Sequence, residues 1–343
     1  MLRLVLLLLG LATVAALVWF IGPARILQAA AGLGPAALLV IFLPSALMYA
    51  LETLGWRLTL GRHAGTVSFG RLFAIRTAGE VVNMTTPTAY VGGEPMKAYL
   101  LKRYGVPLVE GFASVISAKT TMTLAQIIFI LLGIGLSFLT IRQSGTAAET
   151  GGSAGIHVMA AVMSMGLLLF GVAMFVTVQR RGLFRSLLAV LRYCRIRIRV
   201  LESRQDQLEA LDRTIMRFYG HAKPAFLLST GAHFLGWLAE GLEVYAILSY
   251  LGPSVDVLAS VSIAGLAVLI KGGTFFIPGS VGAQESGYVV LLMAFGYSDV
   301  AALTFAVVRR LREVVWIVIG LLCLLAMGGF SGRGTVVDAR GPA

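Results

Sequence analysis

Long apolar runs fill most of this chain and leave it few ways to fold in water. Runs of about twenty largely apolar residues recur along it, and a helix of that length crosses the ~30 Å hydrocarbon core of a bilayer. Charged residues make up 13% of the 343 residues, against about 25% in soluble domains. The sequence therefore predicts an all-α polytopic membrane protein of about six to eight transmembrane segments. Full spans are expected at 3–22, 35–56, 108–140, 157–178, 225–251 and 299–328.

Two further apolar regions, 70–104 and 257–297, are interrupted by helix-breaking residues. The interruptions read NMTTPTAYVGGEP (83–95) and KGGTFFIPGSVGAQE (271–285). Their flanks, of about 12–17 residues, are short for a full span and suit re-entrant half-helices. Unwound backbone at membrane depth persists only where protein or water satisfies its polar groups. Each broken hairpin is therefore expected to border a cavity, although the first limb of the second hairpin also has the option of spanning fully.

The rare polar residues of the chain are spaced as if one unit occurred twice. Because charges at membrane depth cost about 2.5–3.5 kcal/mol each, two sets with equal spacing indicate a duplicated structure. Duplicated halves with broken helices are typical of transporters. A shift of 191 residues places Glu52 on Glu243, Glu80 on Lys271, Pro87 on Pro278, Glu94 on Glu285, Gly105 on Gly296 and Lys119 on Arg310.

Basic residues predict the orientation of the spans. They gather at 57–76, including Arg76, at 97–103, and at 180–223, where eleven Lys and Arg accompany four Asp and Glu. The positive-inside rule places these regions and both termini in the cytoplasm. The span at 35–56 then runs inward and its counterpart at 225–251 runs outward. The halves are thus predicted to be inverted-topology repeats with broken re-entrant hairpins.

The predicted organisation has six parts. The segment 180–220 has leucines at helical spacing among arginines, which is typical of an interfacial helix. It either joins the repeats or recruits a partner such as a lipid-biosynthesis enzyme. The parts are an N-terminal helix and loop (1–34), repeat 1 (35–140), a connecting helix (141–178), a basic amphipathic linker (179–223), repeat 2 (224–328) and a cytoplasmic tail (329–343).

No sequence pattern points to a cofactor or a metal. The four histidines are scattered, the only cysteines are Cys194 and Cys323, and no nucleotide-binding loop or metalloprotease motif occurs. The formal charge of +12 is expected to meet anionic lipid headgroups, not nucleic acid. Any transport is therefore expected to be passive or driven by an ion gradient.

The candidate binding residues lie in and after the broken hairpins. Proline and glycine end a half-helix inside the bundle, and its free N–H groups suit an anion such as a lipid phosphate. Glu94 either lines this cavity or only caps the helix. The first hairpin contributes Glu80, Asn83, Pro87, Gly92, Gly93, Glu94 and Lys97, and the second contributes Lys271, Pro278, Gly282, Gln284 and Glu285.

Charges in the neighbouring helices extend this candidate site. Lys119 lies in the span after the first hairpin, Glu243 in the span before the second, and Arg309, Arg310, Arg312 and Glu313 in the last span. These charges are expected to face the cavity or one another. Arginine suits phosphate, whereas the alternative is a buried network with Glu240, Glu243 or Glu285. Glu80 and Lys271, being equivalent, are hypothesised to pair. Trp56, Trp237 and Trp316 are expected to be packing or interface anchors.

These segments resemble a known family. GEVVNMTTPTAYVGGEPMKAYLLKRYGV (79–106), ASVISAKT (113–120), WLAEGLEVYAILSYLG (237–252) and FFIPGSVGAQESGYVVLLMAFG (275–296) are similar to the flippase-like membrane region of lysylphosphatidylglycerol synthases. The second half resembles the subgroup associated with hopanoid biosynthesis. The resemblance implies a bacterial inner-membrane protein that moves a lipid between leaflets. Full-length synthases carry a soluble aminoacyltransferase domain after this region, for which these 343 residues leave no room.

The expected function is therefore lipid translocation without catalysis. Partners would be phospholipid, polyprenyl or hopanoid lipids, passing through a polar cavity between the repeats. One alternative is an intramembrane lipid-modifying transferase with Glu94 or Glu285 as base, which would favour an asymmetric site. The other is an accessory protein that binds a lipid enzyme through 180–220. Neither the lipid nor the oligomeric state follows from the sequence.

Overall fold

The computed structural model describes residues 22–85, 92–143, 205–251, 255–273, 280 and 282–327, with a few isolated residues elsewhere. Every regular element within these ranges is helical. The predicted spans at 3–22 and 157–178, the linker up to residue 204 and the tail at 329–343 lie outside the described residues. The same holds for the centres of the two hairpin interruptions, at 86–91 and 274–279.

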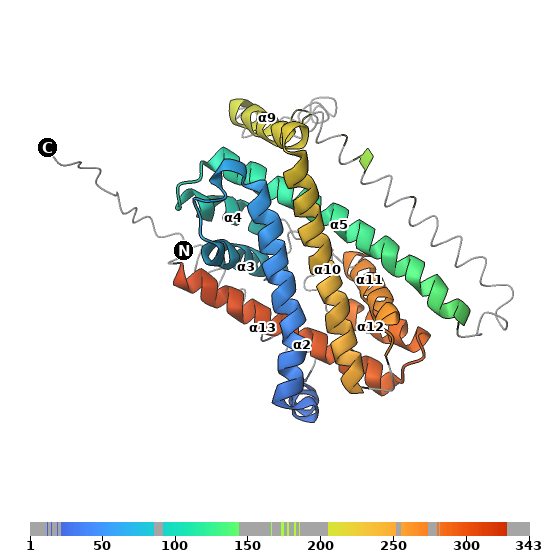
Figure 1. Ribbon diagram of the computed structural model, residues 1–343. Coiled ribbons are helices and arrows are strands. Elements are labelled where there is room, and N and C mark those ends of the chain that lie inside the picture. The colour runs from blue at the N-terminus through green and yellow to red at the C-terminus, as the bar shows by residue number, and fades with distance from the viewer. Residues whose placement is uncertain are drawn as a thin grey trace, which may run out of the picture.

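Two long helices pack against each other at the centre of the molecule (Figure 1). They are α2 (Pro23–Thr59) and α10 (Lys223–Leu251). Helix α2 is broken at Gly34, whose φ of 74° is non-helical, so its spanning part begins at Pro35, where Pro suits the first turn. The close pairs are Gly55 with His233 and Glu52 with Gly236. One residue number falls as the other rises, so α2 and α10 are antiparallel.

Each long helix is followed by a hairpin of two short helices. Helices α3 (Phe69–Thr85) and α4 (Gly93–Lys102) follow α2, and α11 (Val257–Gly273) and α12 (Ala283–Ala294) follow α10. At ~1.5 Å per residue, the 10 residues of α4 reach about 15 Å, half of a bilayer core. The predicted interruptions therefore end helices within the fold.

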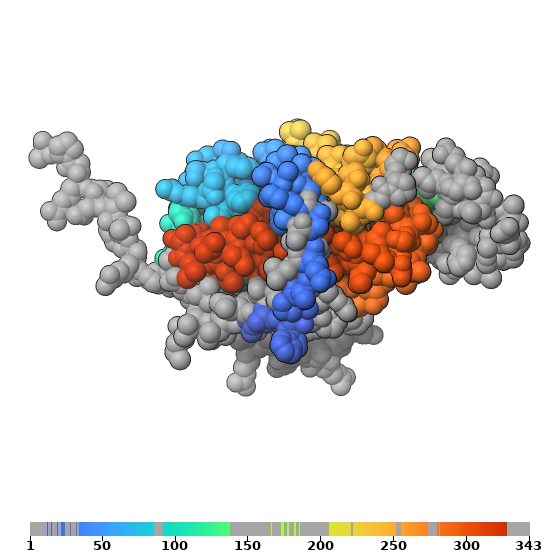
Figure 2. All heavy atoms as spheres, turned by 90° about the horizontal axis from the view of Figure 1, so that it is seen from below, coloured from blue at the N-terminus to red at the C-terminus, as the bar shows by residue number. Residues whose placement is uncertain are grey.

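A long helix then closes each half. We call α2–α5 the N-terminal half and α10–α13 the C-terminal half, where α5 is Leu108–Gln143 and α13 is Asp299–Ala326. Each closing helix packs on the opposite hairpin, α5 on α11 and α13 on α3; Figure 2 shows the end of α13 (red) beside the N-terminal half (cyan). Gly133 and Gly265 let α5 and α11 approach closely, and Ser262 donates to the Gly133 carbonyl at 2.8 Å.

The turns that connect α4 to α5 and α12 to α13 are built alike. The N–H of Gly105 donates to Lys102 O and that of Val106 to Leu101 O. The same bonds recur 191 residues later. They run from Gly296 to Met293 and from Tyr297 to Leu292. Both are Schellman turns, and the glycines have φ of 86° and 84°, values that favour glycine.

Apolar side chains cover the outside of the helices. Leu39 and Leu43 on α2 are 71% and 67% exposed, and Leu227, Leu228 and Leu235 on α10 are also exposed. Several charged residues inside the bundle are buried instead, among them Glu52, Arg76, Glu243 and Arg310. This is the reverse of a soluble protein, and it places lipid at the outer surface.

Three described helices are long and apolar enough to cross a membrane. They are Gly34–Thr59, Leu108–Ser137 and Lys223–Leu251, and they coincide with three of the spans expected from the sequence. Helix α13 has 28 residues but carries Arg309, Arg310, Arg312 and Glu313 at its centre, and α11 is a shorter apolar helix.

The described end of the basic linker forms α9 (Gln205–His221). Its apolar face is not free, because Leu211 and Ile215 are buried against Val109, Phe112 and Ala113 at the start of α5. This part of the linker thus packs on the N-terminal half.

Candidate functional site

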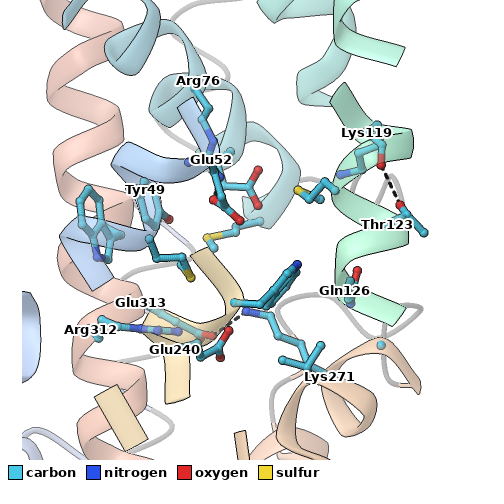
Figure 3. A pocket seen from close by; sticks show the side chains of 18 residues that line it. Tyr49, Glu52, Arg76, Lys119, Thr123, Gln126, Glu240, Lys271, Arg312 and Glu313 are labelled. Carbon is cyan, nitrogen blue, oxygen red and sulfur yellow. Dashed lines mark hydrogen bonds and ion pairs between the residues drawn. The ribbon is translucent and has the colours of Figure 1, made fainter. Parts of the chain in front are cut away.

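A cavity of about 250 Å³ lies at the centre of the described helices (Figure 3). Its walls come from α2, α3 and α5 of the N-terminal half and from the corresponding α10, α11 and α13. The central pair, α2 and α10, contributes Met48, Tyr49 and Glu52 from one half and Trp237 and Glu240 from the other. The two halves thus enclose the cavity with equivalent elements.

The cavity wall combines charged with apolar side chains. Four carboxylates and four cations line it, together with Met48, Met84, Met122, Trp237 and Trp316. Such a wall suits a molecule that has a polar and an apolar part. The charged residues are Glu52, Glu80, Glu240, Glu313, Arg76, Lys119, Lys271 and Arg312.

The first hairpin forms a network around Asn83. Its Oδ1 accepts from the Gly93 N–H at 2.7 Å, and its Nδ2 donates to Glu94 at 3.1 Å and to Glu80 at 3.3 Å. Lys97 Nζ donates to both oxygens of Glu94, at 3.1 and 3.2 Å, and Lys119 reaches Glu94 at 3.4 Å. One amide therefore joins the end of α3 to the first turn of α4.

Glycine at two positions permits this arrangement. A Cβ on Gly93 would overlap the carbonyl oxygen of Gly79, and a Cβ on Gly79 would meet the aliphatic part of Lys97. The backbones of α3 and α4 therefore touch at Gly79 and Gly93. This contact positions Asn83 to accept the Gly93 N–H, which occupies one of the free donors at the start of α4.

The second hairpin forms a corresponding network around Arg310. This guanidinium contacts Glu285, donates to Glu313 at 2.6 Å and to the Ser280 carbonyl at 3.0 Å. Glu313 also accepts from Lys271 at 3.1 Å and from Gln284 at 3.2 Å. Ser280 has a positive φ of 49°, which is uncommon for a residue other than glycine.

Charged pairs also join α13 to α10. Arg309 contacts Glu240 and lies 3.6 Å from Glu243, and Arg312 contacts Glu243. Glu243 is fully buried. The buried network with Glu240, Glu243 and Glu285, which was the alternative to phosphate binding by these arginines, is therefore present. Arg312 and Glu313 also line the cavity.

The structure distributes the sequence-predicted residues over three places. The cavity wall holds Glu80, Lys119, Lys271, Arg312 and Glu313. A smaller cavity of about 30 Å³, which shares the Glu52, Arg76, Glu80 and Lys119 wall, adds Glu94 and Lys97. Pro87 and Pro278 lie outside the described residues. The others, Asn83, Gly92, Gly93, Glu243, Gly282, Gln284, Glu285, Arg309 and Arg310, lie at the hairpins and in the supporting networks.

Three details differ from expectation. Lys271 forms its ion pair with Glu313, and Glu80 lies 3.9 Å from Lys97, so the charges hypothesised to pair with each other have these partners instead. Arg76 is not in a cytoplasmic loop. It is buried on α3, where it contacts Glu52 and lies over the ring of Tyr49.

The two equivalent glutamates also differ from each other. Glu285 caps its helix, accepting from the Gly282 N–H at 2.8 Å. Glu94 makes no such cap, and its carboxylate binds Asn83, Lys97 and Lys119. Capping alone, one of the two interpretations of Glu94, therefore does not describe its contacts.

Several wall residues were not assigned to the cavity from the sequence, and Trp237 and Trp316, expected to be packing or interface anchors, also line it. Tyr49 stacks on Trp316 with ring centroids 3.7 Å apart, and Trp316 Nε1 donates to Ser45 at 3.0 Å. The methionines look like ordinary core residues in the sequence. Glu52 carried a signal, since it aligns with Glu243. His233, buried in the smaller cavity, has no hydrogen-bond partner within the described part of the chain.

The acidic side chains of the described cavity are engaged in ion pairs. Among the described residues, no group of three or more His, Cys, Asp or Glu side chains is placed to hold an ion. The carboxylates of the cavity are committed to Lys and Arg. The chemistry of the wall is therefore that of ion pairs, amides and apolar groups.

The apolar exterior, the three helices able to span and the buried charged cavity define an all-helical integral membrane protein. The chain belongs to the lysylphosphatidylglycerol synthase TM region family, whose model matches residues 7–321. It is 28% identical over 318 residues to a UPF0104 membrane protein of Methanothermobacter thermautotrophicus, covering 90% of both chains. A second UPF0104 membrane protein of that organism is 40% identical over 97 residues, which are 28% of this chain and 27% of the other. No solved structure matches the chain.

Proposed function

We propose that this protein moves a lipid with a polar headgroup between the leaflets of the cytoplasmic membrane, without altering it chemically. The observation that carries the proposal is the central cavity, which has equivalent helices of the two halves as walls and both charged and apolar groups at its surface. A headgroup inside it would avoid bare hydrocarbon, where charged groups are costly. The acyl or isoprenoid chains would stay in the bilayer.

The proposal includes inverted-topology repeats with re-entrant hairpins, six to eight spans and cytoplasmic termini. Three features support the repeats: α2 and α10 are antiparallel, the Schellman turns recur after 191 residues, and α5 packs on α11 as α13 packs on α3. A pseudo-twofold axis in the membrane plane relates such halves. Two alternative states of similar energy then follow from the architecture, one open to each leaflet.

Equivalent ion pairs would act as the gates of these states. Lys119 pairs with Glu94 and Arg310 with Glu285, and both residues of the first pair correspond to those of the second. The first pair is loose, with Lys119 33% exposed, whereas Arg310 is buried and bound by three groups. We interpret the Lys119–Glu94 pair, the Glu94 gate, as the gate that is open in this state. The other state would exchange the two roles.

Reconstitution of the purified protein in liposomes tests this function. Acyl-chain-labelled lipids are bleached from outside, and the protected fraction reports leaflet exchange. We expect protein-dependent exchange that falls at least about tenfold in Glu94→Gln combined with Glu285→Gln, since each substitution removes a charge from a desolvated pair.

The matched control for this test is Glu110→Gln. Glu110 pairs with Arg62 and His63 at the start of α5, away from the cavity wall, and this variant should exchange lipid at the wild-type rate. Size-exclusion profiles confirm folding of each variant. Folded wild-type protein that exchanges no phospholipid, polyprenyl lipid or hopanoid would contradict translocation and favour a lipid-modifying or accessory role.

A further inference from the structure

The charges around the cavity balance, and each has a partner of opposite sign. Arg76 contacts Glu52, Lys271 pairs with Glu313, and Arg312 contacts Glu243. Glu240 contacts Arg309, Lys119 pairs with Glu94, and Glu80 lies 3.9 Å from Lys97. A ligand with a net charge would add an uncompensated charge to this desolvated site, at a high energetic cost. A ligand that carries both signs would not.

Three of the eight charged wall residues are more accessible than the rest. The side chains of Lys119, Lys271 and Glu80 are 33%, 28% and 22% exposed. The other five are below 10%. A ligand in the cavity therefore meets two cations and one carboxylate first. The accessible cations are lysines on flexible stems, whereas the arginines are held in the supporting network.

The shape and the apolar part of the wall restrict the ligand further. A volume of about 250 Å³ is slightly below the ~300–1,000 Å³ usual for small-molecule sites, so it suits a compact headgroup. Trp237 and Trp316 line the cavity, and aromatic faces attract organic cations. The ring of Tyr49 is already in contact with Trp316 and Arg76. An ammonium group close to the two tryptophan rings and to Glu80 would be favourably placed.

We propose that the cavity binds the headgroup of a zwitterionic phospholipid. This inference rests on the proposed function and specifies its substrate. Lys119 and Lys271 bind the phosphate, and Glu80 binds the ammonium group. As the headgroup enters, these wall residues exchange contacts with one another for contacts with the phosphate and the ammonium group. Because the headgroup carries no net charge, the site remains neutral with the ligand bound. The lysines release part of their interaction with Glu94 and Glu313 as they bind the phosphate.

Leaflet exchange and binding are measured separately to test this proposal. Liposomes contain tracers of acyl-chain-labelled phosphatidylethanolamine, phosphatidylcholine or phosphatidylglycerol. Binding is followed in detergent by tryptophan fluorescence during titration with dihexanoylphosphatidylcholine or dihexanoylphosphatidylglycerol, since Trp237 and Trp316 line the cavity. We expect the zwitterionic lipids to exchange and bind about tenfold better than the anionic lipid.

Substitutions assign the roles of the charged groups. Glu80→Gln should remove the preference by weakening the binding and exchange of zwitterionic lipids alone. Lys119→Gln should weaken the binding and exchange of both lipid classes, because both contain phosphate. Glu110→Gln and Lys102→Gln are controls of the same chemistry at positions outside the cavity wall, and should change neither readout. The elution profile of each variant reports its folding.

The outcomes separate this inference from the proposed function. Exchange of phosphatidylglycerol at an equal or higher rate, with a preference that Glu80→Gln leaves unchanged, would overturn the zwitterionic site and leave translocation standing. Selective binding of the zwitterionic lipid without any exchange would support the site and contradict translocation. Folded protein that binds no zwitterionic lipid and exchanges no phospholipid, polyprenyl lipid or hopanoid would overturn both.

Discussion

At the scale of single residues, this protein depends on the compensation of charges that water does not reach. The three arginines of α13 each contact at least one glutamate, and Glu243 contacts two of them. Removing one member of a buried pair leaves the other charge uncompensated. The resulting loss of stability is larger than the net stabilisation that the intact pair provides. Single conservative substitutions should therefore have large effects at these positions.

Glu243→Gln tests this compensation. It leaves Arg312 without its carboxylate and Arg309 with Glu240 alone, so we expect a loss of about 3–5 kcal/mol in the free energy of unfolding. Denaturant unfolding in detergent measures it. Glu110→Gln removes a more exposed pair and should cost below about 1 kcal/mol; equal losses in both variants would contradict the argument.

Gly93→Ala tests the contact between the hairpin backbones. The added Cβ overlaps the carbonyl oxygen of Gly79, so α3 and α4 must separate and Asn83 must lose its bond to the Gly93 N–H. We expect a marked fall in the thermal unfolding midpoint. Gly70→Ala, with nothing within 4 Å of the new Cβ, should be neutral or stabilising because alanine favours helix. A Gly93→Ala variant as stable as wild type would refute the close contact.

At the scale of the elements, the short hairpin helices depend on how they end. Helix α12 starts with the Glu285 cap, and α4 starts with the Asn83 bond instead. Both end in the same Schellman turn. The ends decide where the polypeptide reverses, and hence where the half-helix termini lie in the bundle.

The equivalence of the two turns predicts equal sensitivity. Gly105→Ala and Gly296→Ala each place a side chain at a φ near +85°, at a cost of roughly 1–2 kcal/mol. The ideal Cβ meets no atom closer than 3.6 Å at Gly105 and none within 4 Å at Gly296, so strain is the common cause. The free energy of unfolding should fall by a similar amount in the two variants. A large shift in only one of them would argue against equivalent turns.

At the scale of the whole molecule, the antiparallel arrangement of the halves is the one that the proposed inverted repeats require. The central pair α2 and α10 is antiparallel, and α5 packs on α11 as α13 packs on α3. The cavity lies where the two halves meet. This position is the one that the proposed exchange between leaflets requires.

Cysteine labelling tests the inversion. Leu108 and Asp299, the exposed first residues of α5 and α13, are equivalent after 191 residues. With Cys194 and Cys323 replaced by serine, Leu108→Cys should react with a membrane-impermeant maleimide only from the cytoplasmic side. Asp299→Cys should react only from the opposite side. Labelling of both from one side would contradict inverted repeats, and unaltered elution profiles serve as the folding control.

Much of the architecture was predictable because membrane insertion constrains a sequence strongly. Three long apolar helices lie where the apolar runs indicate, and the described helices of each hairpin end or begin at the predicted interruptions. Glu80, Lys119 and Lys271, which line the cavity, were selected from the sequence because a charged side chain has a high free-energy cost in an apolar environment. Arg76 was misplaced, because a cation near the end of a span and one buried within α3 look the same in sequence.

The sequence by itself determined the membrane class, the breaks of the hairpins and the charged residues that require partners, because each depends on local composition and chain length. Only the tertiary structure decided which charges meet. Glu313 binds Lys271, and Glu94 binds Lys119, since ion pairs between distant segments depend on helix packing. The same packing placed Tyr49, Trp316 and the methionines in the cavity wall. The sequence does not indicate this, because an apolar residue that lines a cavity looks the same in sequence as one that fills a core.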